Sequence, residues 1–220
     1  MEPLYEDNHL LALAKPAGMP VVPDASGDDS LLDLGKAWVK EAYAKPGEVF
    51  LGVVHRLDRP VSGVVVFART SKAAKRLQAA WQAEGEVVKT YLARSAADWP
   101  AGLAEEGEWR QWLWKDRERN RVTVTRREGA REAVTRYRRI GGGSDGADLE
   151  LTAVTGRPHQ LRVACATAGM PLLGDLKYGA PSPLPDKSVG LHAWRLDLPH
   201  PTRDERMRFE APPPSWARLP

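Results

Sequence analysis

The sequence of 220 residues has one cysteine, Cys165, and no long apolar run. A single cysteine excludes an intramolecular disulfide framework and leaves too few thiols for a structural zinc site. No apolar stretch approaches the ~18 residues that a membrane-spanning helix requires, and residues 1–7 carry acid where a secretory signal peptide carries base. We therefore expect a soluble, cytoplasmic protein.

The charge is small overall but unevenly distributed along the chain. The net charge is +3, whereas residues 110–139 contain eleven Lys or Arg and four Asp or Glu and are therefore +7 on their own. A basic segment of this kind suits a partner with a phosphate backbone. A solvated, arginine-rich surface explains the same composition, so the charge alone leaves both interpretations open.

Apolar runs and turn residues predict about nine strands and three helices. The helices are expected from Leu31, capped by Ser30; from a cap at Ser71 to about Glu84; and from Pro158 to just before Gly169. Segments with strand character lie at residues 4–6, 10–14, 53–57, 64–68, 89–94, 121–125, 133–140, 149–154, 191–196 and 207–211, with a glycine-rich turn at 141–146. Because helices and strands do not alternate strictly, we predict one α+β domain over residues 1–220, with a mixed, mostly antiparallel sheet flanked by helices and loops.

Asp58 lies between the predicted strands 53–57 and 64–68 and is followed closely by Pro60 and Gly63. This places a carboxylate at the end of a strand. Residues 15–29 are rich in proline and glycine and are predicted to form a long surface loop, the kind of segment that often lines a site. An isolated aspartate beside a proline, however, usually shapes a turn, and that interpretation stays open from these residues alone.

A second candidate site is the segment TGRPHQLR, residues 155–162. It places the start of a predicted helix beside the guanidinium groups of Arg157 and Arg162, which can hold an anion or lower the pKa of a carboxylate. His159 and Arg162 are three residues apart and project from one helix face. Without such a partner, the segment is a capped helix with exposed arginines.

Six short motifs follow one another along the chain: KPAG at 15–18; HRLD at 55–58 followed by Ser62, Gly63 and Ala68; KTYLA at 89–93; TGRPHQLR at 155–162; Gly174-Asp175 with Tyr178-Gly179; and LHA at 191–193 with His200-Pro201. In these motifs and in their order, residues 15–201 resemble the RluA family of RNA pseudouridine synthases. Two departures are Pro60-Val61, where the family usually has Asp-Thr or a similar polar pair, and Ala164, where it has a polar His or Gln. Neither departure removes a residue with a chemical role.

The resemblance implies that Asp58 acts on the glycosidic carbon or on the base of a uridine flipped out of the RNA. Breaking the C1′–N1 bond builds positive charge on the ribose, which an anionic carboxylate stabilises or captures. Arg162 is expected to pair with Asp58 and keep it ionised, because a nearby opposite charge lowers a carboxylate pKa. Tyr91 is expected to stack on the flipped base and help remove the C5 proton, and Arg56 to fill the space that the uridine leaves.

The implied reaction requires a closed apolar pocket, because the uracil must turn and reattach through C5 without loss to water. Leu57, Val61 and Val64 are expected to form its walls. Further substrate contacts are expected from polar residues of the motifs: His55, Arg56, Lys89, Arg157, His159 and Gln160.

The partners and cofactors follow from the same resemblance. The isomerisation is redox-neutral and internal to the substrate, so no metal or cofactor is expected. The expected partner is structured RNA, ribosomal or transfer, bound by a monomer. Because the first motif begins at Lys15, we expect no separate N-terminal RNA-binding domain. The target uridine cannot be read from the sequence, because RNA recognition depends on loop shape and splayed bases.

The sequence offers three alternatives. A thiol nucleophile at Cys165 with His159 as base is disfavoured, because six residues along a helix place them on opposite faces, and Cys165 is expected to be a core residue. A metal site would require His55, His159, His192 and His200 to converge. A protein that binds RNA but has lost catalysis would be favoured if Asp58, Tyr91 or Arg162 were missing, and all three are present.

Overall fold

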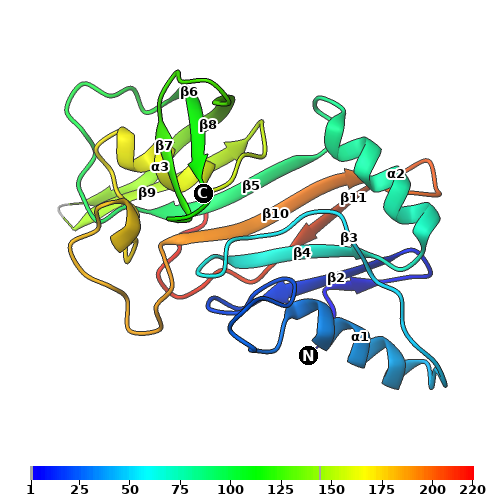
Figure 1. Ribbon diagram of the computed structural model, residues 1–220. Coiled ribbons are helices and arrows are strands. Elements are labelled where there is room, and N and C mark those ends of the chain that lie inside the picture. Colours follow the sequence, from blue (N-terminus) through cyan, green and yellow to red (C-terminus); the bar gives the residue numbers. More distant parts are fainter. Residues whose placement is uncertain (1, 144) are drawn as a thin grey trace. The chain divides into compact units, whose positions relative to one another are not determined.

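The structure is a computed structural model that describes residues 2–143 and 145–220 (Figure 1). Within these residues there are eleven strands, three α-helices and one 3₁₀ helix, and the predicted α+β class is confirmed. The chain forms two compact units, each described here by itself. One contains the residues up to Val88 together with Ala193–Pro212, and the other contains Lys89–His192 and Pro213–Pro220.

The first unit is built on two apolar strands, β2 and β4, which pair antiparallel. Both strands are buried along nearly their whole length, which explains why their sequences, LLALAK and SGVVVFA, are continuously apolar rather than alternating. Strand β1 pairs with β2, β3 pairs with β4, β11 pairs with β10, and β10 lies next to β4. The bounds are β1 Tyr5–Glu6, β2 Leu10–Lys15, β3 Gly52–Val53, β4 Ser62–Ala68, β10 Leu191–Pro199 and β11 Arg206–Glu210.

Two helices, α1 (Leu31–Ala42) and α2 (Ser71–Gln82), cover opposite faces of these strands (Figure 1). Gly35 of α1 lies against Leu11 and Leu13, whereas α2 packs against the alternate side chains of β2. Gly35 permits this close approach, because a Cβ there would lie 3.1–3.5 Å from leucine side chains.

The capping of α1 confirms the prediction, since the Asp33 N–H donates to Ser30 Oγ over 3.2 Å. The predicted cap of α2 at Ser71 is wrong by one residue. Thr70 is the cap, and its Oγ1 accepts the Ala73 N–H over 3.1 Å. Helix α2 also ends at Gln82 rather than at Glu84.

The strand predicted at residues 53–57 is wrong, because β3 contains only Gly52 and Val53. Beyond the pairs of β3 with Ala68 and Phe67 of β4, the Val66 N–H donates to the imidazole Nε2 of His55 over 2.9 Å and not to the backbone of residues that would extend β3. A side chain thus ends the ladder, and residues 54–58 have no regular structure. Asp58 therefore lies in an irregular segment and not at the end of a strand.

The second unit is an antiparallel sheet in the order β5-β9-β8-β6-β7. Strand β6 is eleven residues long, where the sequence predicted only short strands in the basic segment. Helix α3 covers one face through Val163, which packs against Leu113 of β6 and Val122 of β7. The bounds are β5 Val88–Arg94, β6 Glu106–Asp116, β7 Arg121–Val124, β8 Arg131–Gly143, β9 Gly146–Ala153, α3 Gln160–Thr167 and the 3₁₀ helix η1 Leu176–Tyr178.

Helix α3 begins later than predicted, at Gln160 and not at Pro158. Gln160 Oε1 accepts from Thr155 Oγ1 over 2.6 Å and from the Arg157 N–H over 3.0 Å, which winds the preceding residues into a turn. His159 then has a left-handed backbone, with φ of 51°, and no side-chain cap is formed. The predicted end is confirmed, because Gly169 follows the helix with φ of 82°.

The glycine-rich turn predicted at residues 141–146 is shorter than expected. Strand β8 continues through Gly143 and β9 begins at Gly146, which leaves only Asp145 of the described residues between them, because Ser144 lies outside the described residues.

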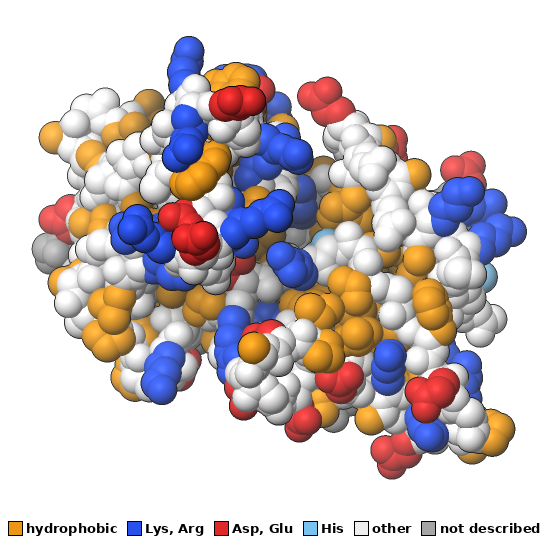
Figure 2. Space-filling view, viewed as in Figure 1, with side chains coloured by type: hydrophobic (Ala, Val, Ile, Leu, Met, Phe, Trp, Pro, Cys, Tyr) orange, Lys and Arg blue, Asp and Glu red, His pale blue; other side chains and the backbone are white. Residues whose placement is uncertain are grey.

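The surface of the second unit is strongly basic. Figure 2 shows Lys and Arg side chains gathered on the face that carries β6, β7 and β8. No helix in the described part of the chain combines the length and the apolar content that crossing a membrane would demand.

Candidate active site

Asp58 is half-buried at the start of a tight turn in the first unit. Its carbonyl accepts the N–H of Val61 over 3.0 Å, which closes the turn through Pro60. The three residues predicted as pocket walls, Leu57, Val61 and Val64, are buried. Asp58 therefore lies on a hydrogen-bonded turn whose flanking residues, Leu57 and Val61, are buried.

Lys15 joins this turn to the first motif. Lys15 is only 2% exposed, and its ammonium donates to the carbonyls of Pro16 (2.9 Å), Met19 (2.8 Å) and Arg59 (3.1 Å). Burial lowers the pKa of Lys15 to about 7, against the opposing effect of the Asp58 charge. Lys15 has a structural role that the sequence did not assign, although a lysine ending a fully apolar strand signals a buried amine that needs partners.

Arg59 holds the loop at residues 15–29 to the same turn. Its guanidinium forms ion pairs with Asp24 and Asp28 and donates to Ser26 Oγ over 2.8 Å. Its carbonyl also accepts the Gly18 N–H over 2.8 Å. The KPAG and HRLD motifs, some forty residues apart in sequence, thus form one local structure, with the long loop attached to the turn that follows Asp58.

His55 and Arg56 differ in their surroundings. His55 accepts the Val66 N–H at Nε2 and stacks on Trp81, with ring centroids 4.7 Å apart and planes 21° from parallel. Because Nε2 is an acceptor, the proton of the neutral ring is on Nδ1. Arg56 is exposed.

The Ser62-Gly63 pair is explained by the packing of β4 against β10. Gly63 has φ of 126°, and a Cβ at this position would lie 2.2 Å from the carbonyl oxygen of Ala193. Only glycine fits, so this part of the HRLD motif maintains the strand that follows the turn.

Tyr91 and Lys89 lie on β5 in the second unit, and both are half-buried. Tyr91 pairs in register with Leu151 of β9. Lys89 Nζ is 3.5 Å from the carbonyl of Thr155, so β5 and the start of the TGRPHQLR segment lie together. Burial lowers the pKa of Lys89.

Arg162 forms a buried, bidentate ion pair with Asp175. Nε and Nη2 each donate over 2.7 Å to one carboxylate oxygen, and both side chains are almost fully buried. Asp175 belongs to the Gly174-Asp175 motif, but the sequence assigned it no role. The sequence carried no signal for this pair, because the burial of Arg162, which calls for a buried acid, is evident only in the structure. The pairing of Arg162 with Asp58 stays a prediction.

Tyr178 of η1 connects several residues of the second unit. Its hydroxyl accepts the Val122 N–H over 3.0 Å and lies 2.6 Å from His159 Nδ1, to which it can therefore donate. The Arg162 guanidinium lies 5.2 Å from the centroid of its ring. Tyr178 thus fixes His159 and borders Arg162, a role not evident from the sequence.

Gln160 and Arg157 shape the turn before α3. Gln160 is buried, and its amide Nε2 donates to the Val134 carbonyl and to Thr135 Oγ1 over 2.9 and 3.0 Å. All four hydrogen bonds of this amide are with protein groups, so Gln160 positions the segment. Arg157 is half-exposed and donates from Nε to the Glu132 carbonyl over 2.9 Å.

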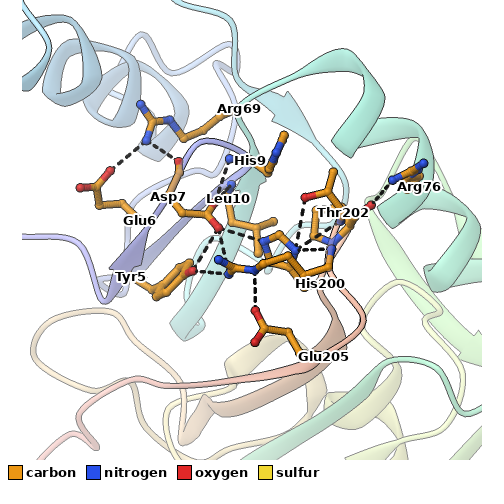
Figure 3. A network of polar contacts seen from close by, with 12 residues as sticks. Tyr5, Glu6, Asp7, His9, Leu10, Arg69, Arg76, His200, Thr202 and Glu205 are labelled. Atoms are coloured by element: carbon orange, nitrogen blue, oxygen red, sulfur yellow. Dashed lines mark hydrogen bonds and ion pairs between the residues drawn. The ribbon is translucent and has the colours of Figure 1, made fainter.

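Three of the four histidines that a metal site would require, His55, His159 and His200, form hydrogen bonds within the protein. His200 is buried, with Nε2 2.9 Å from Asp7 Oδ2, and its Nδ1 accepts the N–H groups of Thr202 and Arg203 (Figure 3). His55 and His159 form the bonds given above. In the described residues, no group of three or more His, Cys, Asp or Glu is arranged to hold a metal ion.

Cys165 is fully buried, which confirms its prediction as a core residue. Burial raises the pKa of its thiol to about 12, so the thiolate that a nucleophile requires is not formed near neutral pH. The thiol mechanism is therefore excluded on chemical grounds.

Comparison with known proteins gives consistent matches. The family described as RNA pseudouridylate synthase matches residues 9–167. The ribosomal large subunit pseudouridine synthase D of Xanthomonas campestris is 35% identical over 96% of this chain, which spans 65% of that relative's length. The dual-specificity RNA pseudouridine synthase RluA of Haemophilus influenzae is 32% identical, over 94% of this chain and 91% of the relative. The structure of human RNA pseudouridylate synthase domain containing 4 is 27% identical, with a TM-score of 0.77 over 97% of this chain and 89% of that chain.

These matches extend across both compact units and include Asp58, Tyr91 and Arg162 within residues 9–167. The relative from Haemophilus is matched over nearly its whole length. The chain belongs to the RluA family of RNA pseudouridine synthases.

Proposed function

We propose that this protein isomerises uridines within RNA to pseudouridine, with Asp58 as the catalytic carboxylate. The observation that carries the proposal is the family match over residues 9–167, within which the HRLD motif is intact. The local structure supports it: Lys15 and Arg59 hold the turn of Asp58 from two sides, and the neighbouring side chains are apolar.

The chemistry divides among three residues in this proposal. The Asp58 carboxylate stabilises or captures the positive charge that develops at C1′ when the bond to N1 breaks. Arg162 keeps that carboxylate ionised, and Tyr91 stacks on the flipped uracil. The uracil turns and bonds to C1′ through C5, and the C5 proton is lost while N1 regains one, so the product is an isomer of the substrate.

The remaining predicted residues bind the RNA around the target. Arg56 is exposed and fills the space that the flipped uridine leaves. Lys89 and Arg157 contact the substrate, whereas His55, His159 and Gln160 act mainly by holding the segments that carry these contacts, as their hydrogen bonds within the protein indicate. Leu57, Val61 and Val64 keep water from the reacting sugar.

The proposal includes the setting of the reaction. The partner is structured RNA, ribosomal or transfer, in line with the printed names of the relatives. We propose that the protein works in the cytoplasm as a monomer, as one catalytic domain, without metal or cofactor.

The test is a map of pseudouridine in cellular RNA with and without the gene. Loss of specific sites in the deletion strain, restored by the wild-type gene and not by Asp58→Asn, is the expected result. An unchanged map would contradict the proposal and favour an RNA-binding protein without catalysis. Retention of the pseudouridines with Asp58→Asn would contradict the role of Asp58.

A further inference from the structure

The basic residues of the second unit fall into two sets. One set is matched by three glutamates: Arg110 pairs with Glu108 over 2.7 Å and with Glu132 over 3.6 Å, Arg136 pairs with Glu108 over 3.3 Å, and Arg138 pairs with Glu150 over 3.1 Å. Arg136 and Arg138 face their glutamates across paired strands, whereas Arg110 and Glu108 lie on the same strand, β6. These arginines contribute little net charge to a partner.

The second set consists of exposed arginines in the β6–β7 hairpin and the turn from β7 to β8, and we call it the basic hairpin surface. Its members are Arg117, Arg119, Arg121, Arg126, Arg127 and Arg131. Over the described residues 2–143 and 145–220, none of the six forms an ion pair. Residues 117–131 contain only two acids, Glu118 and Glu128, beside these six arginines, so the segment is +4.

The hairpin that carries these arginines is fixed to the rest of the unit. The Val122 N–H donates to the Tyr178 hydroxyl over 3.0 Å, and Lys177 Nζ donates to the Asn120 carbonyl over 3.0 Å. Val122 is also part of the core beneath α3. An anchored hairpin holds its positive charges at fixed spacing, which reduces the entropy lost when a polyanion binds.

Tryptophans accompany the arginines on the outer face of β6. Trp112 is 41% exposed, and the Arg127 guanidinium lies 4.1 Å from the centroid of the Trp114 ring. Both tryptophans point away from the face on which Leu113 packs beneath α3, because side chains alternate along a strand. An exposed ring, Trp112, near arginines without ion pairs suits nucleic acid, which offers phosphates to the arginines and bases or riboses to the ring.

The basic hairpin surface also adjoins the residues proposed to bind substrate within the same unit. Tyr178 bonds to Val122 on one side and to His159 on the other, and Arg157 donates to the Glu132 carbonyl at the start of β8. RNA held by Arg157 would therefore continue over the hairpin.

We propose that the basic hairpin surface binds the phosphate backbone of the structured RNA that flanks the target uridine. This inference rests on the proposed function, because it assigns a second contact region to the same substrate. Binding here supplies affinity without reading sequence, through release of counterions from the RNA.

The experiment compares two triple variants of the full chain that each remove three exposed positive charges. Arg117→Ala/Arg119→Ala/Arg126→Ala alters the basic hairpin surface, and Arg110→Ala/Arg136→Ala/Arg138→Ala alters only ion-paired arginines. Affinity for a fluorescently labelled, unmodified RNA stem–loop is measured over a range of salt concentrations. Thermal unfolding checks that both variants fold.

The hairpin variant is expected to reduce the slope of log affinity against log salt by about 2–3 and to bind about 10-fold more weakly near physiological salt. The control is expected to change the slope by less than about 1. Equal losses in the two variants, or no loss in the hairpin variant, would overturn the inference.

Pseudouridine formation by the wild type and both variants is measured on RNA isolated from cells that lack the gene, to separate this inference from the proposed function. If the wild-type chain forms pseudouridine and the two variants have equal salt slopes, RNA binding by the basic hairpin surface is refuted and the proposed function is not. A reduced slope in the hairpin variant, with no pseudouridine formed by any chain, refutes the function and supports the surface.

Discussion

Lys15 and Gly63 illustrate how residues outside the chemistry hold Asp58 in place. Lys15 bonds to three carbonyls on two separate segments, and Gly63 lets β4 approach β10 at the end of the same turn. Both residues are part of the motifs that suggested the family, yet their roles are structural. The sequence located them without revealing their function, because a motif records which residues occur together and not which atoms meet.

Replacement of Lys15 by Met should destabilise the protein by about 2–4 kcal/mol at pH 9, because the carbonyls of Pro16, Met19 and Arg59 lose the buried lysine as their donor. The loss should also depend on pH. The pKa of Lys15 is about 7 in the folded chain and 10.5 ordinarily, so between these values the unfolded chain binds more protons and the stability of the wild type rises with pH. Urea unfolding at pH 6, 7, 8 and 9 checks this. The difference in free energy of unfolding between the wild type and the variant should be constant below about pH 6. Above pH 7 it should widen by up to about 1.4 kcal/mol per pH unit. A difference that stays constant over the whole range would refute the lowered pKa of Lys15.

Gly63→Ala should cost about 3 kcal/mol or more, because the added Cβ meets the Ala193 carbonyl on a backbone with positive φ. Gly27→Ala is the matched control, since Gly27 also has positive φ, of 76°, but has open space around it. The control should cost about 1 kcal/mol. Equal losses of unfolding free energy in the two variants, measured with denaturant, would show that the positive φ and not the close approach of Ala193 requires glycine at position 63.

At the scale of elements, α3 and η1 form one assembly around Arg162. Helix α3 buries Gln160 through Cys165 on all sides, and η1 supplies both the carboxylate that pairs with Arg162, at its N-terminal edge, and the tyrosine ring beside it. This assembly explains why two motifs separated by a dozen residues belong together.

Asp175→Asn should destabilise the protein by about 3–5 kcal/mol, because the buried Arg162 guanidinium loses the carboxylate that accepts two of its N–H groups. Asp145→Asn is the control: Asp145 also pairs with an arginine, Arg94, over 2.9 Å, but its side chain is 80% exposed. The control should lose less than about 1 kcal/mol. Thermal or urea unfolding distinguishes the two, and a comparable loss in both would contradict the account of the buried pair.

Elements with strong local signals were predictable, and those set by distant contacts were not. Ser30 and Asp33 identified the start of α1, and Gly169 the end of α3, because capping is local. The end of β3 depends on the His55 imidazole reaching Val66, and the late start of α3 depends on the Gln160 amide. The helix and strand propensities of single residues do not predict such hydrogen bonds between a side chain and a distant backbone group.

For the whole molecule, the sequence predicted the α+β class, the family and the basic segment. It did not predict that this segment divides into arginines paired across a sheet and arginines left unpaired in a hairpin. That division depends on which residues face each other in β6, β8 and β9, a register that composition does not reveal.

We propose that the protein forms pseudouridine with Asp58 as its catalytic carboxylate. The most direct measurement is the rate at which the purified chain forms pseudouridine in RNA isolated from cells that lack the gene. The wild type should modify the sites that the deletion leaves unmodified, and Asp58→Asn, with unchanged melting and RNA affinity, should be slower by at least about 100-fold. An Asp58→Asn rate equal to that of the wild type would contradict the account.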